Sequence, residues 1–142
     1  MKTRKYAYWI STGFVALAYA GGGIMDLLHA PEVLAAITTL GYPAYLLTIL
    51  GSWKLLGVAA LLAPGLPRLK EWAYAGMFFH FSGAVASHLL SGDQPSHALP
   101  PFMIGLFVIA SWALRPADRT LGVLRLPRFR AAERPSQLHA PA

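Results

Sequence analysis

Cysteine is absent from the 142-residue sequence, and charged residues are scarce. Without a thiol, the chain cannot by itself form a disulfide, use a cysteine nucleophile, or hold thiol-ligated zinc or an iron–sulfur cluster. Only 13% of the residues are charged, against about 25% in soluble domains, whereas 56% are hydrophobic. A chain of this length makes one domain, and one soluble domain could not hide so much apolar surface. No motif names a reaction, so the sequence leaves open whether the protein is an enzyme.

Four long apolar segments predict an all-α fold, an integral membrane four-helix bundle. The predicted spans are residues 6–28, 44–63, 72–90 and 98–114. They make one domain, residues 1–115, and a short surface helix is predicted over residues 30–39. Residues 116–142 are predicted to be a basic, flexible cytoplasmic tail, rich in arginine and proline. A second interpretation places the leucine- and arginine-rich part of this tail on an anionic membrane surface.

Basic residues are distributed unevenly around the predicted spans, and this sets an orientation. The first and third connections contain no lysine or arginine. By the positive-inside rule, both termini are therefore predicted to face the cytoplasm. The net charge of +6 indicates contact with the lipid bilayer and not with nucleic acid, since no soluble basic face is present. Eleven of the twelve basic residues lie at the N-terminus, in the second connection or in the tail: Lys2, Arg4, Lys5, Arg68, Lys70, Arg115, Arg119, Arg125, Arg128, Arg130 and Arg134.

Lys54 is the twelfth basic residue, and it falls in the middle of the second predicted span. About ten residues separate it from each end of that span, or roughly 15 Å of helical rise. A lysine near the bilayer centre costs about 3 kcal/mol or more to insert. We therefore expect Lys54 to face the bundle interior and to have a partner. His80 is predicted to lie at a similar depth in the third span, so both are candidate ligand-binding residues.

A second polar group is predicted at the outer side of the bundle. Asp26 and His29 share a face of the first helix, His88 lies near the outer end of the third, and Asp93 and His97 follow it. These five residues could lie at one level, and Asp26 and His88 are candidate ligand-binding residues. Aspartate and histidine can also ligate zinc or iron. Because their spacing matches no known metal motif, the sequence predicts no metal site; interfacial polar contacts are the plain alternative.

Small and aromatic residues complete the pattern. Ala16 and Ala20 form a small-xxx-small pair that allows close helix packing, and the triple glycine at residues 21–23 allows either close helix contact or a kink. Trp53 lies beside Lys54 and is a candidate for stacking on a flat ring such as a quinone. The alternative is that Trp53 and the phenylalanines of the third span simply contact lipid.

Several short motifs follow one another in fixed order: Leu40–Pro43, Gly51–Gly57, Pro64–Gly76, and Gly83–His88 with Asp93. Together they resemble the DoxX-like family of small bacterial four-helix membrane proteins. The resemblance covers roughly residues 6–115 and implies a multi-pass bundle in the bacterial inner membrane. It also implies a link to redox chemistry, because some relatives belong to quinone-linked sulfur oxidation or to membrane redox complexes.

Two functional hypotheses follow from these observations. The first is a small subunit or accessory protein of a redox or stress-related membrane system, with a quinone-like ligand near Lys54 and His80. If the chain takes part in catalysis, it does so as part of a membrane oxidoreductase complex. The second is a non-enzymatic assembly or interaction protein, whose partner is another membrane protein or a second copy of the chain. Catalytic residues are not identified, and a transporter is disfavoured because no inverted repeat is visible.

Overall fold

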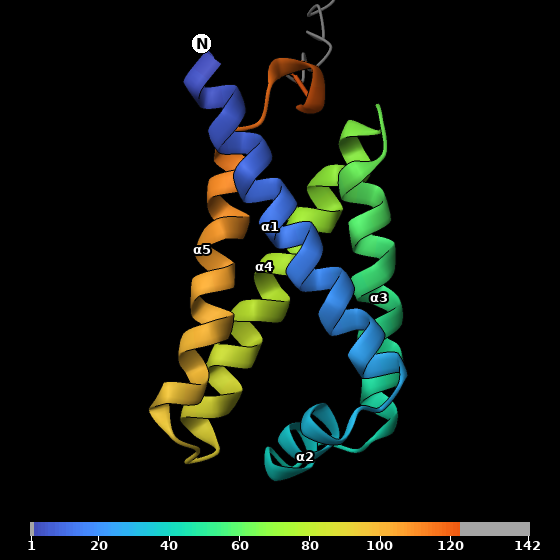
Figure 1. Ribbon diagram of the computed structural model, residues 1–142, viewed down its shortest axis with the longest axis vertical. Helices are drawn as coiled ribbons and strands as arrows, with labels where there is room; N and C mark the ends of the chain where they lie inside the picture. The colour runs from blue at the N-terminus through green and yellow to red at the C-terminus, as the bar shows by residue number, and fades with distance from the viewer. Residues whose placement is uncertain (1, 123–142) are drawn as a thin grey trace, which may run out of the picture.

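The computed structural model describes residues 2–122, which fold into four long helices and one short one (Figure 1). The predicted membrane four-helix bundle is confirmed, and no strand is present within these residues. The predicted tail lies mostly outside the described residues; residues 116–122 of it belong to them. The elements are α1 (Lys2–Leu27), α2 (Pro31–Thr39), α3 (Tyr45–Leu62), α4 (Pro67–Leu90), η1 (Pro95–Ala98), α5 (Leu99–Ala113) and η2 (Ala117–Arg119).

Two helices begin earlier than the apolar runs alone indicated. α1 starts at Lys2 rather than near residue 6, and α4 starts at Pro67 rather than near residue 72. Proline suits the first helical position because it has no N–H group to leave unpaired there. Leu66 precedes it in the left-handed conformation, with φ of 52°, and so turns the chain sharply into α4. The charged first turn of α4 is therefore helical, although hydropathy excluded it from the span.

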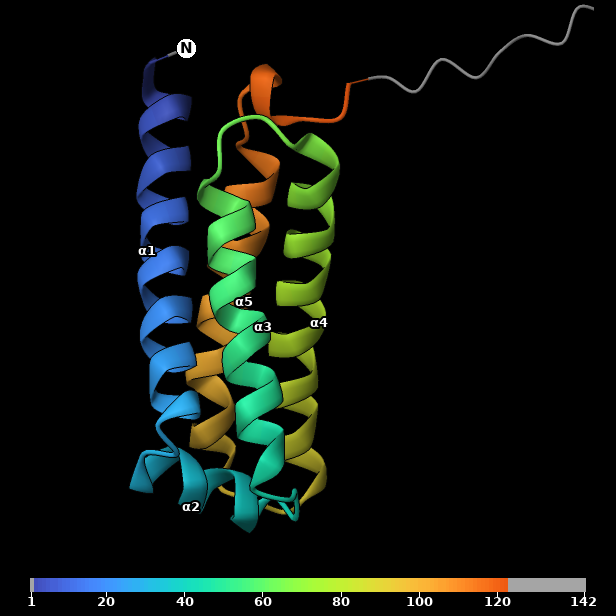
Figure 2. The ribbon, with the colours of Figure 1, turned by 90° about the vertical axis from the view of Figure 1, so that its right-hand side faces the viewer.

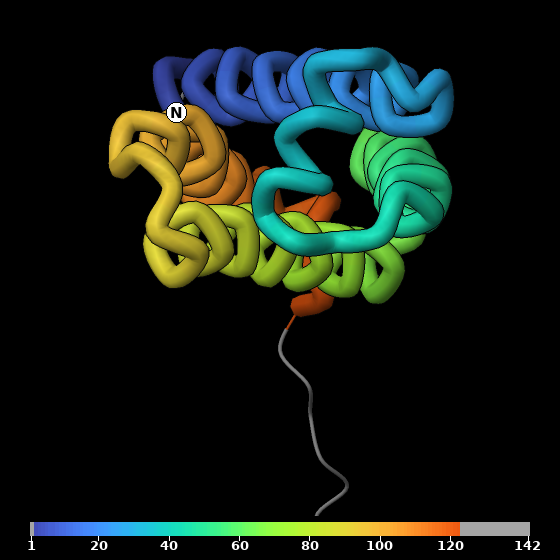
Figure 3. The backbone as a smooth tube through the Cα atoms, turned by 90° about the horizontal axis from the view of Figure 1, so that it is seen from below, coloured from blue at the N-terminus to red at the C-terminus, as the bar shows by residue number. Residues whose placement is uncertain are grey.

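The four long helices occupy the corners of a bundle (Figures 2 and 3). α1 packs against α3 and α5, and α4 packs against the same two helices from the opposite side. α2 lies across one end of the bundle, close to the α4–α5 connection, and we refer to this as the α2 end (Figure 1). The N-terminus, the α3–α4 connection and η2 lie together at the other end, which we call the basic end.

The bundle centre is a small apolar cluster drawn from all four long helices. Its members are Val15, Tyr19, Leu61, Tyr74, Met77, Phe81 and Val108. Beside it, three hydroxyl groups form a buried chain between helices. The Ser111 hydroxyl is 2.7 Å from the Thr12 hydroxyl of α1 and 2.7 Å from the Tyr74 hydroxyl of α4. In a membrane, the hydrophobic effect does not drive helices to associate, because lipid is as apolar as their side chains. Polar contacts such as these therefore help to hold the helices together.

The outer surface of the bundle is strongly apolar. Leu17, Trp72 and Leu90 are each more than three-quarters exposed, an arrangement that suits lipid and not water. Three segments are long and apolar enough to cross a membrane: α1, α3, and η1 with α5. α4 has 24 residues and is also long enough, but its first turns carry Arg68, Lys70 and Glu71.

Basic side chains close the basic end of the bundle. Lys70 is completely buried, and its Nζ donates hydrogen bonds to the last carbonyl oxygens of α3: those of Ala60 (3.0 Å), Leu61 (3.3 Å) and Ala63. A lysine in this place satisfies helix C-terminal carbonyls that would otherwise have no partner. Arg119, in η2, donates to the Tyr8 hydroxyl and also to the Leu61 carbonyl, each at 3.3 Å.

Candidate functional site

Close contact between α1 and α3 prepares the polar centre of the bundle. A Cβ atom placed on Gly51 of α3 would lie only 2.8 Å from the Gly23 carbonyl oxygen of α1. A Cβ on Gly23 would lie 3.0 Å from the Cβ of Lys54. Glycine at these two positions therefore lets the two backbones touch. This contact brings the last turn of α1 within reach of the middle of α3.

Lys54 obtains its partner through that contact. Its Nζ donates a hydrogen bond of 2.6 Å to the Asp26 carboxylate. The Asp26 side chain is 4% exposed and that of Lys54 is 15% exposed, so protein atoms shield most of the ion pair from lipid and water. The sequence argument required a partner for Lys54 but left its identity open. Asp26, 28 residues earlier, supplies the opposite charge that His80 could not.

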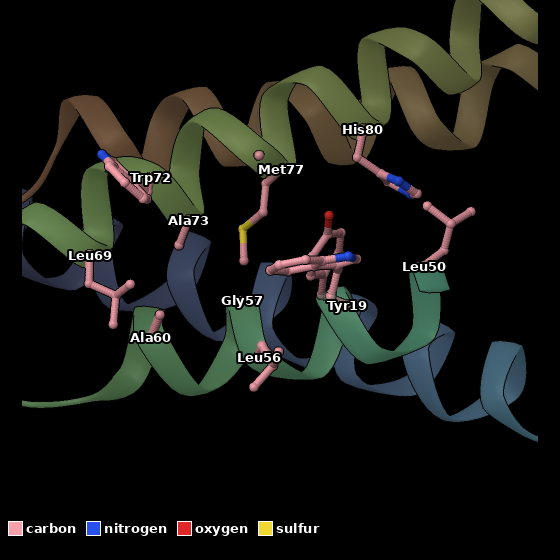
Figure 4. Close-up of a pocket in the computed structure, with 12 residues that line it drawn as sticks. Tyr19, Leu50, Leu56, Gly57, Ala60, Leu69, Trp72, Ala73, Met77 and His80 are labelled. Atoms are coloured by element: carbon pink, nitrogen blue, oxygen red, sulfur yellow. The ribbon is translucent and has the colours of Figure 1, made fainter. Parts of the chain in front are cut away.

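An apolar cavity of about 480 Å³ lies between α3 and α4, with Tyr19 of α1 at its base (Figure 4). Leu69 and Trp72 lie toward one end of this cavity, and His80 and Leu50 lie at the other. Trp53 and Trp72 line it and are 68% and 79% exposed, so they also face the lipid. The volume is in the range of pockets that hold small organic ligands.

A second cavity, of about 390 Å³, lies toward the α2 end of the same helix pair. It is more polar, because Asp26, Lys54 and His88 are among its lining residues. α2 covers it with apolar side chains that include Val33 and Ile37. This explains why the short helix across the end of the bundle carries apolar residues at helical spacing.

His80 lines both cavities. Its ring packs edge-on against Tyr19 and Phe81, with centroid distances of 5.7 and 5.3 Å. Among residues 2–122 no side chain or backbone group hydrogen-bonds its ring nitrogens. His80 is only partly buried, and its ring nitrogens are open to the cavities that it lines. His80 is thus a free donor and acceptor between an apolar and a polar cavity.

The five residues expected at one outer level separate into three groups. Asp26 pairs with Lys54, and the His29 Nε2 lies 3.3 Å from the Thr48 hydroxyl instead. The remaining three form a cluster at the α2 end. The Asp93 carboxylate lies 2.7 Å from the Nδ1 of His88 and 3.0 Å from that of His97. Asp93 belongs to the turn between α4 and α5. Its hydrogen bond with His88, and to a lesser extent the one with His97, lowers the pKa of the Asp93 carboxyl to about 2.

Every ligand-binding candidate from the sequence lines one of the two cavities. Lys54, Asp26 and His88 line the polar cavity, Trp53 lines the apolar one, and His80 lines both. The sequence argument missed Tyr19 and Trp72, which complete the apolar cavity from α1 and α4. No local signal marks these two, because an aromatic residue at helical spacing is typical of any packed or lipid-facing position.

Together the cavities provide an apolar slot beside charged and imidazole groups. The slot can accept a flat hydrocarbon-rich molecule, and Lys54 or His80 can donate a hydrogen bond to an oxygen atom on it. The arrangement therefore supports binding and orientation of a ligand.

Comparisons with known proteins agree with this architecture. No curated protein and no solved structure matches the chain. The model of one family, described as the DoxX-like family, matches residues 10–111, which include α3, α4, most of α1 and α5, and the residues that line both cavities. The matched segment covers most of the chain, and the earlier resemblance is confirmed. The protein belongs to the DoxX-like family.

Proposed function

We propose that this DoxX-like membrane protein is a small accessory subunit of a redox or stress-related membrane system, and that it binds a quinone-like molecule between α3 and α4. The observation that carries the proposal is the position of His80. It has no hydrogen-bonding partner among the described residues and lies where an apolar cavity meets the cavity of the Lys54–Asp26 pair. A ring oxygen there would accept a hydrogen bond from the imidazole or from Lys54 Nζ.

The apolar cavity fits the remainder of such a ligand. Trp53 and Trp72 provide aromatic surfaces on the lipid-facing side, and Met77 and Leu69 provide flexible apolar walls. A quinone that diffuses in the bilayer could enter sideways between these residues without crossing water. The protein groups would hold and orient the ring, while electrons would come from or go to a partner in the membrane.

The test uses the purified full chain in lipid nanodiscs and a short-tailed benzoquinone as the probe. Quenching of tryptophan fluorescence reports binding, because Trp53 and Trp72 line the cavity. We expect His80→Leu and Lys54→Ala variants that remain folded by circular dichroism to bind at least tenfold more weakly. His29→Ala is the matched control, since His29 lines neither cavity. Unchanged binding in both folded variants would remove the proposal.

Mass spectrometry of the gently extracted protein separates this proposal from the interaction-protein alternative. A lipophilic quinone that co-purifies with the wild-type chain, and is depleted in His80→Leu, supports ligand binding. Stable co-purification of another membrane protein with no small molecule bound supports an assembly role instead.

We also propose that the chain crosses the bacterial inner membrane several times with both termini in the cytoplasm. The fold supports this orientation, because the N-terminus, the α3–α4 connection and η2 share the basic end (Figure 1). The lack of cysteine makes the test simple. A single Ser91→Cys substitution, in the turn after α4, should be labelled by an impermeant maleimide from the outside of the inner membrane, whereas Thr3→Cys should not. The reverse pattern would invert the topology.

A further inference from the structure

We infer that His88, Asp93 and His97 form a binding site for a divalent transition metal of the zinc type at the α2 end of the bundle. One ligand atom from each residue lies within 4.8 Å of the other two. The site shares His88 with the polar cavity but lies outside the apolar cavity proposed to hold the quinone, and it does not depend on that proposal. It also departs from the sequence expectation of no metal, which rested on the lack of a known metal motif.

The local backbone holds the three side chains in place. His88 lies in the last turn of α4, and Gly92, with φ of 72°, reverses the chain after it. The backbone N–H of Gln94 donates a 2.8 Å hydrogen bond to Asp93 Oδ1, and this bond holds the carboxylate in position. η1 then returns His97, four residues after Asp93, to the same carboxylate. Two imidazoles and one carboxylate thus converge from a helix end, a turn and a short helix.

The distances suit a small ion after a modest rearrangement. Zinc binds histidine nitrogen and carboxylate oxygen at about 2.0–2.2 Å, so tetrahedral ligand atoms lie roughly 3.3 Å apart. The Asp93 Oδ2 atom is 2.7 Å from His88 Nδ1 and 3.0 Å from His97 Nδ1. An ion would replace these direct hydrogen bonds. Each imidazole would then carry its proton on Nε2, which frees the Nδ1 lone pair.

The chemistry of the donors selects the class of ion. Two imidazole nitrogens favour zinc and neighbouring transition metals over calcium or magnesium, which prefer oxygen ligands. Three protein ligands leave one position for water, and the 55% exposed side chain of His97 puts the cluster within reach of solvent.

The charge of this end also favours a cation. The connections at residues 28–44 and 91–98 contain no lysine or arginine. His88 also lines the polar cavity with Lys54 and Asp26, so an ion here would lie beside that cavity.

The test measures zinc binding to the chelator-stripped full chain, purified with a tag free of histidine. We expect about one zinc ion per chain by elemental analysis, together with a rise in the thermal unfolding midpoint on adding zinc. Cobalt substitution gives a second measurement, because four-coordinate Co²⁺ has intense visible absorption bands that six-coordinate aqueous Co²⁺ lacks.

His97→Ala is the informative variant, since an exposed side chain can be removed without unfolding the bundle. We expect it to weaken zinc binding at least tenfold and to abolish both the midpoint shift and the cobalt bands. Asp93→Asn should act in the same way while it keeps the size of the side chain. His29→Ala, which removes a histidine from the same end outside the cluster, should bind like the wild type. Failure of the wild type to bind zinc, or equal binding by His97→Ala, would overturn the inference.

Discussion

Replacing Lys54 by methionine keeps the length of the side chain but removes its charge, and leaves the Asp26 carboxylate buried beside α3. At 2.6 Å the gross attraction in the ion pair is about 6 kcal/mol for an effective dielectric constant of 20. The desolvation of both groups offsets much of this attraction. Removing one partner of a buried pair nevertheless costs about 3–5 kcal/mol, because the other charge loses its compensation. We expect Lys54→Met to lose stability in that range.

Removing both charges should cost less than removing one. In the Lys54→Met/Asp26→Leu double variant neither charge remains buried, and apolar replacements of buried pairs are often close to neutral. The free energy of unfolding can be measured in mixed micelles with increasing SDS, followed by circular dichroism. Lys5→Met serves as the control, since Lys5 is exposed in α1. If Lys54→Met and Asp26→Leu each lose under about 1 kcal/mol, or if their losses simply add in the double variant, the buried ion pair does not stabilise the fold.

Two further predictions concern the packing of the helices. Gly51→Ala should destabilise the fold by about 1–3 kcal/mol in the same micelle assay, because its Cβ would meet the α1 backbone at 2.8 Å. Gly76→Ala is its control and should not lose stability, since no atom lies near the added Cβ. Equal effects of the two substitutions would contradict the close contact of α1 and α3. Ser111→Ala should cost about 1–2 kcal/mol, because two buried hydroxyls lose their partner. Ser82→Ala is its control, since that hydroxyl bonds only to a carbonyl within α4, and identical unfolding curves would argue against a role for the hydroxyl chain.

Hydropathy and charge made the membrane bundle predictable, because each apolar segment is long and the breaks between segments contain proline and glycine. The start of α4 was harder to place, since Lys70 and Glu71 are polar and were assigned to the connection. In the structure Lys70 is buried against the last carbonyls of α3. A lysine that satisfies helix-end carbonyls and one that faces water look the same in sequence, and only the packing of the two helix ends distinguishes them.

The candidate site was predictable in its residues but not in its pairings. The energetic cost of a central charge marked Lys54 as unusual. The identity of its partner depends on how closely the backbones of α1 and α3 approach each other. Gly23 and Gly51, 28 residues apart, together allow that close approach. The histidine–aspartate cluster likewise depends on the turn after α4. Spacing along a helix could not reveal it, because Asp93 and His97 lie beyond that helix.

The contacts of Arg119 have a consequence for the order in which the bundle is completed. Its guanidinium lies over the Trp9 ring, 4.8 Å from the centroid, and donates to groups of α1 and α3. Chains enter the membrane from the N-terminus during synthesis, so α1 and α3 are made and inserted well before residue 119 emerges from the ribosome. The basic end therefore acquires the contacts of Arg119 only after α5 has been synthesised. Assembly of this end follows the insertion of α1 and α3.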